Sequence, residues 1–465
     1  MASDPIEVGR QYFCREQTTG EQFPGMFYVD ANEMSVTLYS FEGRISLKTD
    51  DPLALRLENN RIASLHQNVS SGPGYMGGPN GVTHSHRVIS NVVVIGVDAW
   101  DAADPVRRVQ FEIEHAEDLM HHGQKFDEVA DAEFRKMLDT TVFDLSTAGI
   151  NVKVWYAASG RRPFKRATTI GVRYSVEFDE PTELNSYLTT VNCIARFASA
   201  ALGFRVVPSD IHISRLSQAD FLKAVEGGSY RGDHEVRYIW HGQTPRRSLW
   251  LTNSFVSARD DKELAVLIEA LRAWITRDAE WRDATNLMMG AFDLERTMSG
   301  ERLLTACKWL EEIPEASSAV AVSAAHIDRI ASAAAAEAEH LGHKDYKNRI
   351  AGVIRGQLKT ESNAKRFERL RAAVCARFGN HALPADAVPD LMKAMQFRGE
   401  VAHGAFEPFD DHEFRIFAKS VYAMEALCYL LTIKELPMTE MGARRACDIE
   451  IVANYRRFPS EMIGG

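Results

Sequence analysis

The sequence lacks the motifs by which several common enzyme classes are recognised. It has six cysteines in 465 residues, and no two of them form a C-x-x-C pair or another tight spacing, which argues against a disulfide framework and a zinc knuckle. No G-x-x-x-x-G-K-S/T occurs, which excludes a phosphate loop of the nucleotide-hydrolase type, and no G-x-S-x-G supports acyl transfer. The sequence therefore points away from these chemistries.

Long apolar runs are also missing. The run "VVVIGV" from Val92 is far too short for a bilayer. The N-terminus "MASDPIEVGRQYF" has neither the basic start nor the apolar stretch of a signal peptide. We therefore expect a cytoplasmic protein with no membrane contact, and scattered cysteines fit that reducing compartment.

The chain has no overall excess of basic residues, since its net charge is -10. A negative total disfavours nucleic-acid binding, which depends on neutralising phosphates. Residues 344–377 differ, because they hold ten basic and three acidic residues. Five of these basic residues are candidate RNA contacts: Lys347, Arg349, Arg355, Lys359 and Arg366. The alternative is that the stretch forms an ordinary solvated helix face.

The N-terminal part alternates apolar and polar residues, which is the pattern of half-buried strands. Clusters of Gly, Pro, Asn and Asp separate these segments, so we expect a largely antiparallel sheet or sandwich. The expected strands cover 34–41, 87–97, 108–115, 151–159, 170–178, 204–214 and 235–242. A helix is expected among them at 182–203, where the period of the pattern changes.

From residue 260 onward the period is helical. The expected helices cover 260–281, 290–312, 317–341, 345–357, 363–378, 386–403 and 411–436, and the alanine-rich 317–341 is expected to pack closely. The fold class is therefore α+β, with a β-rich domain at 1–290 followed by an all-α bundle at 291–465.

Two further patterns favour structural roles. The segment "GPGYMG" from Gly72 fits G-x-G-x-x-G, but a strand pattern follows it where a dinucleotide site needs a helix, so we expect a flexible loop. Three histidine pairs have no third ligand nearby in sequence, so we expect no metal site: His84 and His86, His121 and His122, and His340 and His343.

The stretch "FRGEVAHG" places Arg398 and His403 five residues apart in an otherwise apolar helical pattern. A guanidinium forks onto two phosphate oxygens, and an imidazole titrates near neutral pH and can move a proton to or from a ribose hydroxyl. This pair suits cleavage of RNA by attack of its 2′-hydroxyl, which needs neither a metal nor another cofactor.

The spacing alone does not bring the two side chains together. On a straight helix they lie ~140° apart around the axis and ~7.5 Å apart along it. Gly399 weakens the helix after the arginine, and Gly404 and Pro408 are expected to end it after the histidine. A two-fold dimer is the other route, because it brings two copies of the motif to one cleft.

The structural alternative for the motif involves no substrate. In that interpretation Arg398 pairs with Glu400 or Asp390, and His403 caps the end of the helix. Both interpretations remain open on the spacing alone.

Several segments together carry a family resemblance. In the C-terminal half these are "SGERLLTACKWLEE", "FRGEVAHG" and the apolar "FAKSVYAMEALCYLLTIKEL"; in the N-terminal half they are "FPGMFYVDANEMSVTLYSF" and "VVVIGVDAW". The C-terminal half resembles HEPN domains of the ApeA-like branch, whose motif is R-x-x-x-x-H. The N-terminal half is similar to the β-rich domain that precedes HEPN in ApeA proteins, so the resemblance covers most of the chain.

The resemblance implies a HEPN endoribonuclease that acts as a homodimer, with Arg398 and His403 as its catalytic pair. It further implies anti-phage defence through damage to RNA, for which transfer RNA is one candidate. The N-terminal domain is then expected to sense a trigger, such as a phage-derived protein, or to restrain the nuclease. Many members have a polar residue after the motif arginine where this chain has Gly399. A non-catalytic HEPN module that binds RNA or protein is therefore the alternative.

Overall fold

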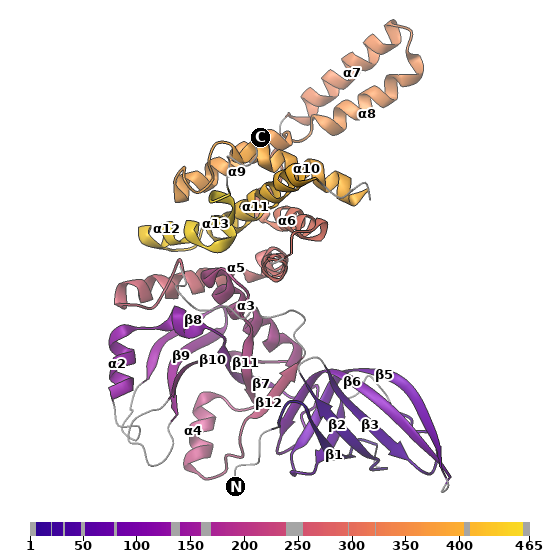
Figure 1. The fold of residues 1–465 in the computed structure, drawn as a ribbon, viewed down its shortest axis with the longest axis vertical. Helices are drawn as coiled ribbons and strands as arrows, with labels where there is room; N and C mark the ends of the chain where they lie inside the picture. The colour runs from indigo at the N-terminus through magenta and orange to yellow at the C-terminus, as the bar shows by residue number, and fades with distance from the viewer. Residues whose placement is uncertain are drawn as a thin grey trace. The chain divides into compact units, whose positions relative to one another are not determined.

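A computed structural model describes residues 6–19, 21–30, 33–47, 52–78, 81–131, 140–159, 169–238, 254–295, 297–320, 322–403 and 410–458 (Figure 1). The chain forms two compact units. The first, called the β unit, comprises Met1–Ala198, Val206–Thr244 and Ala258–Ile268. The second, called the helical unit, comprises Ser199–Arg205, Pro245–Ser257 and Glu269–Gly465.

The predicted α+β class is confirmed, because an antiparallel β region is followed by helices. The division between the units differs from the predicted boundary at 290. One long helix, α5 (Asp261–Asp293), runs through the point where the units divide, between Ile268 and Glu269. A composition pattern cannot show a division inside a continuous helix.

Six strands of the β unit close into a barrel. Their order is β3-β2-β1-β4-β5-β6, and β3 also pairs with β6, which closes the ring. The strands are β1 (Arg10–Glu16), β2 (Pro24–Val29), β3 (Met34–Ser40), β4 (Leu53–Leu57), β5 (Ile62–Gly78) and β6 (Gly81–Gly96). Fully buried side chains such as Phe27, Val36, Leu55 and Leu65 form its core. Closure removes the unpaired edges that an open sheet would expose.

The long strand β6 joins the barrel to a second sheet, because its first half pairs with β3 and its second half with β12. The order continues β12-β11-β7-β10-β9-β8. These strands are β7 (Val106–Ile113), β8 (Thr141–Thr147), β9 (Ile150–Ser159), β10 (Thr169–Thr182), β11 (Pro208–Ser214) and β12 (His234–Tyr238). The helices interspersed with them are α1 (Ala116–Met120), α2 (Gly123–Asp131), α3 (Leu184–Leu202) and α4 (Gln218–Glu226).

One expected loop is instead a strand. The segment "GPGYMG" from Gly72 lies within β5 and pairs with β6. Gly72 has a φ of +92°, and the pairing register shifts between Ser70 and Pro73. Such an irregularity lets glycine and proline sit in a strand, because the residues around it still pair with the neighbouring strand. The flexible-loop prediction is therefore wrong, and this segment has no helix after it to hold a dinucleotide.

All the predicted helices of the C-terminal part are present, but the first runs on to Asp293 instead of ending at 281, and the second begins at Gly300 instead of 290. The predicted helices correspond to α5, α6 (Gly300–Glu312), α7 (Ala324–His340), α8 (Lys347–Gln357), α9 (Asn363–Phe378), α10 (Ala387–Ala402) and α11 (Asp411–Ile433). Serines at the N-caps fix several starts: Ser299, Ser323 and Ser362 each accept a hydrogen bond from the backbone N–H three residues on. Two short helices that the pattern does not predict follow, α12 (Glu440–Asp448) and α13 (Glu450–Arg456).

Helices α7 and α8 pack against each other as a hairpin, which Figure 1 shows projecting beyond α9 and α10. Only Ile327, Ala331 and Ala338 of α7 are buried, whereas Ile330 is 45% exposed. The alanine-rich helix therefore packs against α8 along one narrow face that includes Ala331 and Ala338, and it leaves the rest of its surface exposed. Alanine favours helix formation without requiring a large buried face.

Helix α11 forms the centre of the helical unit. By length and composition this helix is apolar enough to cross a membrane, but 83% of its most apolar window is buried inside the protein. It packs against α6, α9, α10 and α13. That burial is what a core helix shows, and α11 agrees with the helix predicted at 411–436.

A buried ion pair links α6 to α11. The Nε and Nη2 of Arg302 each donate to one carboxylate oxygen of Glu425, both at 2.7 Å, and the two side chains are 2% and 0% exposed. The Nη1 of Arg302 also donates to the carbonyl of Glu295, at 2.6 Å, in the segment before α6. Burial raises the pKa of Glu425, and the guanidinium of Arg302 opposes that shift.

Removing one member of this pair is expected to destabilise the helical unit strongly. Arg302→Ala or Glu425→Ala leaves the other charge buried without its partner, which typically costs ~3–5 kcal/mol. Urea unfolding followed by far-ultraviolet circular dichroism measures the change.

The matched control is Arg272→Ala, which removes the exposed pair that Arg272 forms with Glu269. It is expected to change stability by less than ~1 kcal/mol. The double variant Arg302→Met/Glu425→Leu, which replaces both charges by apolar groups, is expected to recover most of the loss. A loss for Arg302→Ala no larger than that of the control would contradict this account.

Candidate functional site

The "FRGEVAHG" motif lies at the C-terminal end of α10. One face of this helix is buried, and it includes Leu391, Ala394 and Phe397. The Phe397 ring packs edge-on against Phe417 of α11, with ring centroids 5.5 Å apart. The apolar residues of the motif therefore fix the helix in the bundle and leave Arg398 and His403 outside this buried face.

The helix runs through Gly399 without interruption. It ends at Ala402, and His403 is the C-cap residue, whose backbone N–H donates to the carbonyls of Gly399 and Val401. The side chain of His403 is exposed. The predicted helix end after the histidine agrees with this, but Gly404 and Pro408, which were expected to cause it, lie outside the described residues.

Arg398 is paired with a residue that the sequence did not indicate. Its Nη1 lies 2.6 Å from Oε1 of Glu311 in α6, and the two side chains are 34% and 45% exposed. The two partners considered from the sequence are engaged elsewhere: Glu400 accepts from Gln396, and Asp390 pairs with Lys419. A partner 87 positions away in sequence becomes a neighbour only through the packing of α6 against α10.

A continuous helix keeps the two motif side chains apart within one chain. Because they are five positions apart, the two side chains are ~140° apart around the axis. Arg398 points toward α6, where Glu311 lies, and His403 is at the end of the helix. One copy of the chain therefore presents an arginine and a histidine near each other in sequence but does not bring them together on one phosphate.

Cys307 in α6 is a buried thiol close enough to the ion pair for both charges to act on its pKa: Arg398 lowers it and Glu311 raises it. Burial raises the pKa of Cys307 to about 12, against which the charge of Arg398 acts only in part. A thiol held in its neutral form is a poor nucleophile. This cysteine therefore contributes packing to the site and no nucleophilic chemistry.

The five candidate RNA-binding residues fall into three groups. Arg349 and Lys359 are exposed. Lys347 pairs with Glu339 at 3.2 Å and Arg355 with Asp328 at 2.8 Å, so two of the five charges are locally balanced.

Arg366 is a correction to the candidate set. It is 9% exposed, and its Nε donates to the carbonyl of Ala316 at 2.7 Å. Burial lowers its pKa. Its guanidinium is committed to holding the segment after α6, so Arg366 does not belong among the RNA contacts.

The histidine pairs are engaged separately, and the described residues contain no group of three or more His, Cys, Asp or Glu residues that could hold a metal ion. His86 is buried, and its Nε2 lies 3.0 Å from the hydroxyl of Ser70. The Nε2 of His122 lies 3.2 Å from Oδ1 of Asp261. His340 ends α7, and Gly342 beyond it has a φ of +85°, the left-handed conformation that glycine often adopts after a helix end.

No family model, curated protein or solved structure matches this chain. The resemblance to HEPN domains therefore depends on the residues quoted above. What the geometry adds is the position of the motif on α10, its exposure, and the pairing of Arg398 with Glu311.

Two glycines next to the motif predict opposite responses to substitution. A Cβ at Gly399 would meet nothing within 4 Å, whereas one at Gly300 would lie 2.9 Å from Cγ1 of Val401. Gly399→Ala is expected to stabilise the protein by ~0.5–1 kcal/mol, because alanine is the better helix former. Gly300→Ala is expected to give no gain, because the branched Val401 side chain is stiff.

Thermal unfolding of the two variants and the wild type measures the difference. A lower midpoint for Gly399→Ala than for the wild type would mean that α10 is not a regular helix at this position.

Proposed function

We propose that this protein is a metal-independent RNA endonuclease of the HEPN type that acts in anti-phage defence. Arg398 stabilises the charge on the phosphate in the transition state, and His403 moves a proton to or from the 2′-hydroxyl or the leaving oxygen. The observation that carries the proposal is the position of a half-buried Arg398 and an exposed His403 at one end of a helix, both outside its buried face.

The proposed active unit is a homodimer formed through the helical unit. A continuous α10 separates the two side chains by ~140° around its axis, so one chain alone does not complete the site. A two-fold axis near the end of α10 would place the arginine of one copy beside the histidine of the other. The β unit then senses a trigger, for which a phage-derived protein is a candidate.

Several acidic residues flank the motif, among them Glu400, Asp410, Asp411 and Glu413, so RNA is expected to approach from the basic stretch 344–377. Exposed Arg349 and Lys359 lie at α8 and just beyond it, and phosphate binding is driven by such charges. Transfer RNA is a candidate substrate.

A non-catalytic HEPN module that binds RNA or protein is the second candidate. It is favoured by Glu311, which balances the charge of Arg398, and by Gly399 in place of a polar residue. Cleavage separates the two candidates.

Cleavage by the wild type should depend on His403. Purified wild type, Arg398→Ala and His403→Ala are incubated with total RNA and with transfer RNA in EDTA, and the cut ends are mapped. The wild type is expected to leave 2′,3′-cyclic phosphate or 3′-phosphate ends, and loss of proton transfer is expected to slow cleavage by ~10²–10⁴-fold. Equal cleavage by all three proteins would contradict the assignment, and binding without cleavage would favour the second candidate.

The same assay tests the shared site. Neither single variant carries both groups, but a mixed dimer of Arg398→Ala and His403→Ala has one composite site with an intact arginine and an intact histidine. Mixing the two inactive variants is therefore expected to restore part of the activity. Subunit exchange is verified with differently tagged chains. If exchange occurs and activity does not recover, the arginine and the histidine of each site come from the same chain.

Glu311→Gln should strengthen RNA binding. An exposed ion pair is worth ~0–1 kcal/mol, so releasing Arg398 is expected to lower the Kd for a single-stranded RNA by up to about five-fold. Fluorescence anisotropy measures the affinity. Glu312→Gln is the matched control, because it removes an exposed negative charge from the next position of α6. Equal gains in the two variants would mean that only the net charge matters.

A further inference from the structure

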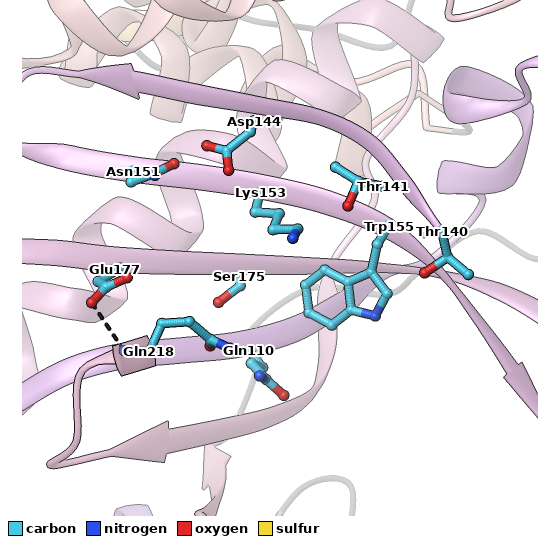
Figure 2. Close-up of a pocket in the computed structure, with 10 residues that line it drawn as sticks. All are labelled: Gln110, Thr140, Thr141, Asp144, Asn151, Lys153, Trp155, Ser175, Glu177 and Gln218. Atoms are coloured by element: carbon cyan, nitrogen blue, oxygen red, sulfur yellow. Dashed lines mark hydrogen bonds between the residues drawn. The ribbon is translucent and has the colours of Figure 1, made fainter. Parts of the chain in front are cut away.

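The exposed face of the second sheet carries a pocket that the proposed nuclease does not use. Its volume is about 350 Å³, which is in the range of small-molecule sites, ~300–1,000 Å³. Side chains from β7, β8, β9 and β10 and the first residue of α4 line it (Figure 2). All of these elements belong to the β unit.

Alternation along the strands produces this face. On β9, Val152, Val154 and Tyr156 are buried, so the residues between them point to the other side. The opposite face of the sheet is therefore fixed by an apolar core, and the polar face is held rigidly by the same backbone.

The strand register builds the floor of the pocket. Four residues lie directly opposite one another across the strands: Asp144, Lys153, Ser175 and Gln110. Figure 2 shows the ring of Trp155 on one side of this row, and Asn151 and Glu177 on the other. Polar groups from four neighbouring strands therefore form the floor of the pocket, with one large aromatic ring at its side.

Hydrogen bonds fix one wall of the pocket and leave another group unsatisfied. The backbone N–H of Gln218 donates to Glu177 at 3.0 Å, and the side-chain oxygen of Gln218 accepts from Arg108 at 2.7 Å. Within the part of the chain that the structure describes, the buried Oδ1 of Asn151 has no hydrogen-bond partner. This oxygen has almost no accessible surface, so a ligand in the pocket does not contact it, and the ligand's hydrogen bonds fall to the other polar groups of the lining.

The charge of the pocket selects against anions. Lys153 offsets one of the two carboxylates, Asp144 and Glu177, so the lining has a net negative charge. The other polar groups are hydroxyls and amides, which both donate and accept. The two ionised carboxylates can only accept hydrogen bonds, so a ligand that satisfies them must carry several hydrogen-bond donors. Phosphorylated and carboxylated ligands therefore fit poorly.

The arrangement of the polar groups distinguishes a sugar from a nucleobase. A base presents its donors and acceptors along coplanar edges, whereas the hydroxyls of a saccharide ring extend in all directions. Here the polar groups come from four strands around the space, and the apolar face of Trp155 can pack against the carbon-bound hydrogens of a ring.

We infer that this pocket binds an uncharged saccharide. The ring of Trp155 packs against one face of the sugar, and Asp144 and Glu177 accept hydrogen bonds from its hydroxyls. This site does not depend on the proposed nuclease, and it gives the β unit a ligand of defined chemistry.

Saturation-transfer NMR on the full-length protein tests the inference. The neutral probes are glucose, galactose, mannose, N-acetylglucosamine and their disaccharides; the comparison probes are glucuronic acid, adenosine and uridine. We expect at least one neutral sugar to bind the wild type, with its affinity reduced about tenfold or more in Trp155→Ala and largely kept in Trp155→Phe. Tyr75→Ala, which removes an 81% exposed ring from β5, is the matched control and should bind as the wild type does.

Three results would overturn the inference. They are the absence of binding by every neutral sugar, equal binding by the wild type and a Trp155→Ala variant whose circular dichroism is native, and preferential binding of glucuronic acid or of the nucleosides. Asp144→Ala provides a second variant that keeps the aromatic ring and removes an exposed acceptor, and it too is expected to weaken sugar binding.

Discussion

The buried pair of Arg302 and Glu425 is the constraint on which the helical unit depends. Two opposite charges without solvent access tolerate no other arrangement, because each would be left unpaired if α6 shifted along α11. The same guanidinium holds the carbonyl of Glu295, so it fixes the entry to α6 as well. Since α6 carries Glu311, this pair determines where the partner of Arg398 lies.

The β unit depends on a different constraint, which is the closure of its first six strands. Because β3 pairs with both β2 and β6, the barrel has no open edge among these strands, and β6 can extend into the second sheet. Along β9 the buried Val152 and Val154 hold one face against the core. The polar face is then free to carry function without contributing to stability, as the pocket beside Trp155 illustrates.

Local patterns predicted the helices better than the strands. Helical periods and N-cap serines such as Ser299 and Ser362 are local signals, and they placed most helices of the C-terminal half within a few residues. Strands β1, β2 and β4 are short and depend on their partners, and the glycines of β5 read as a loop. The motif arginine and histidine were candidates because of their residue types and the family resemblance, whereas their spacing alone left the structural alternative open. Glu311 was not, because its pairing arises only when α6 packs against α10.

The pairing of Arg398 with Glu311 bears on how the proposed nuclease is controlled. Such a half-exposed ion pair is worth at most ~1 kcal/mol, so an approaching phosphate can displace Glu311 at small cost. The greater barrier is geometric, since a continuous α10 keeps His403 on another side of the helix. If the site is shared between two copies, activity requires only that the two α10 helices be placed side by side. Neither copy then has to change the conformation of its own motif. A trigger bound by the β unit then needs only to alter how two helical units associate, which is a rigid-body change that leaves each buried core intact.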